Sequence, residues 1–164
     1  MKKQLITSAF AVFAAFFFAC KNDMLLDDKK TVVGKSWAYP DSLRFDFDLA
    51  DTSHFYNLFV DVEHADDYPF ENLYVKIHTI LPSGKRLSKT RSLQLAAPSG
   101  EWLGSGSGEK ITARLVLQEH ALFREPGHYA LVFEQWMRQD SLTGISAIGL
   151  AVQRTNEKRG DKPK

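Results

Sequence analysis

The chain has 164 residues, a length typical of one domain, and its formal net charge is +1. This near-neutral balance gives no electrostatic basis for binding nucleic acid, whose protein partners cluster Lys and Arg on one face. No DNA- or RNA-binding motif is present either, so we expect no nucleic-acid partner. Hydrophobic residues make up 44% of the chain and include 12 Phe, which is enough material for a folded core.

The first twenty residues have the features of an exported precursor. Lys2 and Lys3 precede an apolar run over residues 5–19 that is broken only by Thr7 and Ser8. This run is shorter than the roughly 20 residues that a membrane-spanning helix needs. A positive start, a short apolar run and a small residue at its end are typical of a signal peptide, which we predict over residues 1–19.

Cys20 is the only cysteine of the chain and follows this run directly. A single cysteine cannot form an internal disulfide, and a small residue before the cysteine, here Ala19, is what a bacterial lipoprotein signal requires. Phe17 and Phe18 depart from the usual residues of that signal. We predict that Cys20 is lipidated and anchors the chain to a membrane. A plain signal peptide cleaved elsewhere and a retained membrane helix are the alternatives.

The residues after Cys20 divide into three predicted parts. Residues 21–30 are polar and lack clear periodicity, so we predict a lipidated tether over residues 20–36. The alternating patterns described below fill residues 37–153, which we predict to be one domain. Residues 154–164 are rich in charge and also contain Gly and Pro, and we predict a flexible tail there.

The domain has the period-two pattern of β-strands. Leu43, Phe45, Phe47 and Leu49 alternate with polar residues and would share one face of a strand. Six further segments alternate in the same way: residues 56–62, 73–77, 87–95, 111–117, 129–133 and 145–152. No segment between them has a competing helical pattern. We therefore predict an all-β fold, an antiparallel β-sandwich of about seven or eight strands.

A search for catalytic and metal-binding patterns finds little. The chain has no G-x-S-x-G motif, and its histidines do not have metal-ligand spacing, so we expect them at the surface or on edge strands: His54, His64, His78, His120 and His128. The carboxylates of Asp46, Asp48 and Asp51 lack the glycine and distal glutamate of a calcium loop, and we interpret them as a solvated strand face. We predict no catalytic residue, no metal site and no cofactor.

The glycine-rich segment over residues 102–108 is another candidate motif. A phosphate-binding loop would need G-x-x-x-x-G-K-[ST] between a strand and a helix, and Lys110 is misplaced for that. We interpret the glycines as a backbone feature that lets the chain bend past a packed Trp102.

Several short motifs resemble, in order, the gliding motility lipoprotein GldH family of the Bacteroidetes. They are DYPFENLY at 67–74, LPSG at 81–84, GEWLGSG at 100–106, PGHY at 126–129, EQWMR at 134–138, LTGI at 142–145 and IGL at 148–150. The resemblance covers residues 37–152. Two departures are Lys89, where the family tends to have an acidic residue, and the region of Glu63 and His64, where it often has Arg.

The resemblance implies a non-enzymatic cell-envelope lipoprotein of the gliding machinery, which supports assembly or stability of gliding and type IX secretion components. Its partners would be the membrane, through Cys20, and other gliding or type IX secretion lipoproteins. Asn22 interrupts the acidic signal that usually exports such lipoproteins to the cell surface. We therefore expect the outer membrane, with the domain facing the periplasm.

Four residues of the motifs are candidates for binding a partner: Tyr74, Trp102, Trp136 and Arg138. The alternative interpretation is that they maintain the fold. A different function, binding of glycans by a membrane-anchored sandwich, would require Tyr74, Trp102 and Trp136 to line one exposed concave patch.

Overall fold

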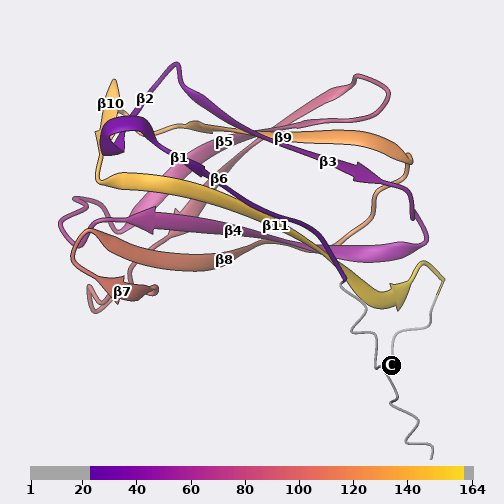
Figure 1. Cartoon of the computed structure of the whole chain (residues 1–164). Coiled ribbons are helices and arrows are strands. Elements are labelled where there is room, and N and C mark those ends of the chain that lie inside the picture. Colours follow the sequence, from indigo (N-terminus) through magenta and orange to yellow (C-terminus); the bar gives the residue numbers. More distant parts are fainter. Residues whose placement is uncertain (1–22, 161–164) are drawn as a thin grey trace, which may run out of the picture.

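The computed structural model describes residues 23–160, and it is built almost entirely of antiparallel strands. Two sheets pack face to face (Figure 1). The first has five strands, in the order β1 (Met24–Thr31), β11 (Ile145–Lys158), β4 (His54–His64), β8 (Lys110–Ala121) and β7 (Ser105–Ser107). The second has four, in the order β3 (Ser42–Leu49), β9 (Gly127–Gln135), β5 (Asn72–Ile80) and β6 (Arg86–Gln94).

A small third sheet closes one end of the sandwich. It pairs β2 (Ser36–Ala38) with β10 (Ser141–Thr143), and a single 3-10 turn, η1 (Val33–Lys35), leads into it from β1. Trp37 of β2 and Leu142 of β10 are both buried, so this sheet covers the end of the core. Within residues 23–160, no helix has the length and apolar character needed to cross a membrane.

The alternation in the sequence matches the burial of the side chains. In β3, Phe45 and Phe47 are buried while Arg44, Asp46 and Asp48 between and beside them are exposed. The inward-facing side chains of both sheets form one hydrophobic core. Phe45 meets Phe133 of β9 edge to face, with ring centres 5.6 Å apart. The prediction of an all-β antiparallel sandwich is confirmed, and each of the seven predicted strands is present.

Residues 23–160 form eleven strands rather than about seven or eight, and this corrects the predicted boundaries. The prediction of a tether over residues 20–36 is wrong where β1 lies. This strand pairs with β11, from Met24 opposite Gln153 to Thr31 opposite Ala147. Charged side chains lie on both faces of β1, which is common for an edge strand. The side-chain pattern therefore gives no clear strand signal, although backbone hydrogen bonds hold the strand in place.

The predicted tail is corrected in the same way. Strand β11 continues to Lys158, where it pairs with His54, although its side chains from Gln153 onward are polar. The Arg154 guanidinium also donates to the Asp23 carboxylate at 2.6 Å. The predicted signal peptide and the lipidation residue Cys20 lie outside the described residues.

One side of the sandwich is left open. Strand β6 is the last strand of the second sheet, and β7 covers β8 only from Lys110 to Thr112. From residue 113 to 121, β8 has no strand on its outer side among residues 23–160. The unpaired edges of β6 and β8 therefore border a gap between the two sheets.

Candidate functional site

Three of the four candidate residues line one hollow. Tyr74 is on β5 and points to the outer face of the second sheet, and Trp136 follows β9 directly, so that its backbone N–H donates to the Tyr74 carbonyl at 2.8 Å. Arg138 is two residues further on. The hollow has a volume of about 550 Å³ and is lined by Phe70, Asn72, Tyr74, Trp136, Met137, Arg138 and Gln139. We call it the aromatic hollow.

A buried glutamine fixes the segment that forms one wall. Gln135 is fully buried, and its side-chain NH₂ donates to the Gln139 carbonyl at 2.8 Å while its side-chain oxygen accepts from the Met137 N–H at 2.9 Å. Both polar atoms of the amide are satisfied by the segment that follows β9. The position of Trp136 and Arg138 thus depends on a side chain of the core.

The aromatic rings of the hollow are exposed but ordered by contacts. Trp136 is 39% exposed and Tyr74 is 44% exposed. The Trp136 ring lies 5.6 Å from the ring of Tyr39, and the Lys76 ammonium lies 4.3 Å from its centre. This is the geometry of a cation–π contact. One face of the indole is therefore already used within the protein.

Arg138 gives the hollow its charge. It is exposed, and none of the residues 23–160 forms a salt bridge or hydrogen bond with its guanidinium. With Lys76 beside Trp136, the hollow has two cations near its rings. Such a surface suits a partner that offers an acidic side chain next to an apolar one.

Trp102 is not part of the aromatic hollow. It is half-buried, its indole N–H donates to the Asp66 carboxylate at 2.9 Å, and its ring centre lies 4.5 Å from that of His64. An isolated bridge between Trp102 and Ala96 ties the same segment to the chain after β6. These contacts indicate a role in the fold. Only Tyr74 and Trp136 line the aromatic hollow, so the three rings required for glycan binding do not share one patch.

The expectation of surface histidines is wrong for two of the five. His64 is fully buried, and His78 is 4% exposed, with its ring nitrogens bound to Ser88 at 2.6 Å and Glu134 at 3.1 Å. The His78 ring is satisfied by these two partners, whereas His64 has its Nδ1 2.9 Å from the Ala65 carbonyl oxygen and its Nε2 without a hydrogen-bond partner among residues 23–160. The spacing of single histidines does not reveal such burial. Within residues 23–160, no group of three or more His, Cys, Asp or Glu is placed to hold a metal ion.

The shifted pKa values of the carboxylates arise from local structural contacts. Hydrogen bonds from the side chain and backbone of Ser53 hold the pKa of Asp51 far below its usual range, with a smaller contribution from His54. Burial of Glu63 would raise its pKa, but hydrogen bonds from Ser146 and Lys29 lower it overall. Neither carboxylate lines the aromatic hollow.

Several residues of the site were not anticipated from the sequence. Alternation in β5 places Lys76 on the same face as Tyr74, so that signal was available. Tyr39 comes from the segment after β2, and only the tertiary fold brings it to Trp136. Gln135 occupies an inward position of a strand, where sequence reasoning expects an apolar residue.

Fold and site together define an antiparallel β-sandwich protein with an exposed aromatic and cationic hollow at one end. The chain belongs to the GldH lipoprotein family, whose model matches residues 24–152. The match begins at the first residue of β1, which supports placing that strand within the domain. The prediction of this family is confirmed.

Two curated relatives match along most of their length. The gliding motility lipoprotein GldH homolog of Christiangramia forsetii is 28% identical over 161 residues, which cover 91% of this chain and 98% of the relative. The gliding motility lipoprotein GldH of Flavobacterium johnsoniae is 29% identical over 147 residues, which cover 85% and 91%. Both names place the family in gliding motility.

Among solved structures, the chain is similar to a carbohydrate-binding module, CBM28, described as specific for non-crystalline cellulose. Its TM-score is 0.39 at 12% identity, and the match covers 79% of this chain and 73% of the module.

Proposed function

We propose that this chain is a non-enzymatic cell-envelope lipoprotein of the gliding motility machinery that supports the assembly or stability of gliding and type IX secretion components. In this proposal it is anchored through Cys20 to the outer membrane, with the domain facing the periplasm. The family relationship supports the part of this proposal that concerns gliding motility. The single observation that supports docking is the aromatic hollow, which presents Trp136, Tyr74 and the unpaired Arg138 at one place.

The residue types of the hollow are those that dominate protein–protein binding. Trp, Tyr and Arg are enriched among the few interface residues that contribute most of the binding energy. The buried Gln135 amide and the Lys76 contact hold the Trp136 ring in place before a partner arrives, which lowers the entropy lost on binding. The Arg138 guanidinium would then pair with a partner carboxylate.

The hollow also points away from the proposed anchor. Asp23 and the start of β1 lie beside Arg154, at the end of the sandwich where β11 finishes. The hollow lies at the other end, where β9 finishes and β5 begins. β1 alone spans roughly 25 Å at the usual rise per strand residue. A membrane-anchored chain would therefore hold the hollow clear of the lipid surface.

The proposal is tested in a gliding host that carries variants of its own gene. Deletion of the gene should abolish spreading or type IX secretion. The double variant Trp136→Ala with Arg138→Glu should strongly reduce whichever of the two the deletion abolishes, while the amount of protein stays unchanged. Val116→Ala is the matched control, since Val116 is 55% exposed on β8 and lies outside the hollow. Normal spreading and secretion in the deletion strain would refute the proposal.

The second candidate is a glycan-binding lipoprotein, and the presence of Tyr74 and Trp136 in one open hollow favours it. Sugars stack on a free aromatic face, whereas Lys76 already lies over the Trp136 ring. Docking of a protein is therefore the better fit. A glycan array with the wild type and Trp136→Ala separates the two: binding of a glycan that the variant loses would establish the second candidate.

A further inference from the structure

The open side of the sandwich contains an apolar groove. It consists of two connected hollows of about 430 and about 260 Å³, which share the lining residues Leu58, Thr79, Leu87, Gln118 and Leu131. Their combined space lies within the roughly 300–1,000 Å³ typical of small-molecule sites. The groove runs between the unpaired edges of β6 and β8, on a different part of the molecule from the aromatic hollow.

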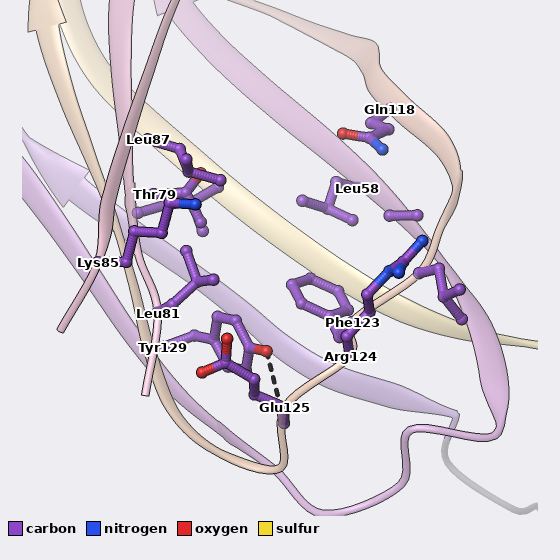
Figure 2. Close-up of a pocket in the computed structure, with 13 residues that line it drawn as sticks. Leu58, Thr79, Leu81, Lys85, Leu87, Gln118, Phe123, Arg124, Glu125 and Tyr129 are labelled. Carbon is purple, nitrogen blue, oxygen red and sulfur yellow. Dashed lines mark hydrogen bonds between the residues drawn. The ribbon is translucent and has the colours of Figure 1, made fainter. Parts of the chain in front are cut away.

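The inner wall of the groove is hydrocarbon and aromatic surface. Figure 2 shows Leu58, Leu81, Phe123 and Tyr129 around one space. Phe123 meets Tyr129 edge to face, with ring centres 4.9 Å apart. The Tyr129 hydroxyl donates to the Glu125 carbonyl at 2.7 Å, so its one polar atom is already satisfied. This part of the wall thus offers apolar contacts, while Lys85, Arg124 and Glu125 also line the larger hollow.

Two cations stand beside this wall on the inner face of β6. In the antiparallel pairing of β6 with β5, Lys89 lies opposite Ile77 and Arg91 lies opposite Val75. Opposite residues of an antiparallel pair point to the same face, and Ile77 and Val75 are buried in the core. Lys89 and Arg91 therefore project toward the space between the sheets, where they line the groove with Leu87.

These cations have no ion-pair partner in the part of the chain that the structure describes. Neither Lys89 nor Arg91 forms a salt bridge with any of the residues 23–160, whereas their neighbour Arg86 lies 3.7 Å from the Glu134 carboxylate. Inward-pointing charges also protect edge strands from pairing with other chains. Protection of the β6 edge needs only the two charges. It does not explain why an apolar groove lies beside them.

We propose that the groove binds an anionic amphiphile with one unbranched acyl chain. The chain packs along Leu58, Leu131 and Phe123, and the anionic head lies between Lys89 and Arg91. A thin hydrocarbon chain suits the wall, because it leaves no polar group unsatisfied there. A peptide strand would instead pair with the open edge of β6 or β8, and the inward-pointing Lys89 and Arg91 disfavour that pairing on β6.

The position of the groove suggests where such a ligand comes from. Tyr56 contacts Phe123 at one end of the groove and donates to the Asp51 carbonyl, and Arg154 joins this region to Asp23. The groove therefore reaches the end of the sandwich that faces the membrane if the chain is anchored at Cys20, a step that rests on the proposed function. A free fatty acid and a lysophospholipid both have one acyl chain and an anionic head, and so share the required chemistry.

Photocrosslinking in isolated envelope membranes tests the proposal. Membranes carrying the full chain are incubated with palmitic acid that bears a diazirine and an alkyne, and labelled peptides are mapped by mass spectrometry. We expect labels on segments 81–93 and 117–124. The corresponding alcohol should label these segments about tenfold less, the difference expected for the loss of a charge-assisted contact. Adding the probe after synthesis prevents its incorporation at Cys20.

Variants decide whether the groove is responsible. Lys89→Glu with Arg91→Glu should reduce labelling by about tenfold, and Leu87→Trp should reduce it by filling the groove from a half-exposed position. Arg159→Glu is the matched control, because Arg159 is an exposed cation outside the groove. Labelling by photoactivatable lysophosphatidylglycerol would identify a single-chain lipid phosphate as a source, and labelling by the fatty acid alone would identify the free acid.

Two outcomes would overturn the proposal. One is labelling spread evenly over the groove and the outer face of β3. The other is labelling unchanged by both the charge reversal and Leu87→Trp. Neither depends on motility, and immunoblotting of the membrane fraction reports anchoring separately. Failure of the proposed function and failure of this proposal are therefore distinguishable.

Discussion

His128 lies between two carboxylates on the outer face of the second sheet. Its Nδ1 is 2.9 Å from the Asp48 carboxylate and its Nε2 is 3.0 Å from that of Asp46. Hydrogen bonds to Asp48 and Asp46 raise the pKa of His128 above its ordinary value of 6.5. A raised pKa stabilises the folded state below the unfolded pKa, and this contribution is lost as the pH rises through the folded value.

We expect Asp48→Asn to lower the pKa of His128, because it removes the partner with the largest effect. The ring proton resonances of His128, followed by NMR from pH 5 to pH 9, measure this. Asp41→Asn is the control, since Asp41 is also exposed and has no contact with His128. A His128 titration that is identical in wild type and Asp48→Asn would contradict the expectation.

The glycine-rich segment before β8 has a backbone role that single substitutions can test. Gly106 has φ +128°, and a Cβ built there would lie 2.1 Å from the Lys110 carbonyl oxygen, whereas Gly108 has φ +62° and open space. We expect Gly106→Ala to lower the free energy of unfolding by about 2–4 kcal/mol, from strain and steric conflict together. Gly108→Ala should cost about 1 kcal/mol, from its left-handed backbone alone. Urea denaturation measures both, and equal losses would contradict the steric argument.

At the scale of elements, β1 decides where the domain begins. If residues 24–31 form the edge strand, their amides that bond to β11 should exchange with solvent far more slowly than those of an unstructured tether. Hydrogen exchange of the full chain, followed by mass spectrometry, measures this directly. The loop over residues 138–140 is an internal reference for rapid exchange, since its residues are exposed and no strand includes it. Exchange of residues 24–31 as fast as that loop would restore the tether interpretation.

The strands that sequence reasoning found differ physically from those it missed. β3 and β4 bury one face, and their hydrophobic alternation follows from that. β1 and the end of β11 are held by backbone pairing with polar side chains on both faces, and β2, β7 and β10 have three residues each. Such segments have too little buried surface to leave a periodic signal.

The candidate site divides in a similar way. Motif residues Tyr74, Trp136 and Arg138 lie together because β5 and β9 are neighbours in the second sheet, and their role in binding a partner stays a prediction. Trp102 was grouped with them only because of its residue type, and it packs on His64 instead. The buried Gln135 could not be foreseen, because its partners are backbone atoms of the next turn.

At the scale of the whole molecule, the sandwich has two different ends. The start of β1, the end of β11 and the Phe123 end of the groove lie together, and the aromatic hollow lies at the opposite end. The two proposed sites therefore serve different surroundings. If the chain is anchored and oriented as proposed, one faces the membrane side of the domain, and the other is presented to a partner protein in the periplasm.

The orientation of both sites relative to the membrane depends on whether Cys20 is the anchor. Cys20→Ala should abolish incorporation of alkyne-labelled palmitate in the native host, because the thiol is the only atom of the chain to which a lipoprotein diacylglycerol can be attached. The unfolding midpoint should stay unchanged, since Cys20 precedes the first strand of the sandwich. Ser8→Ala, a substitution within the same leader, is the control and should keep the label.

Palmitate incorporation that persists in Cys20→Ala would exclude Cys20 as the anchor. The orientation of the hollow and groove relative to the membrane would then have to follow from another attachment.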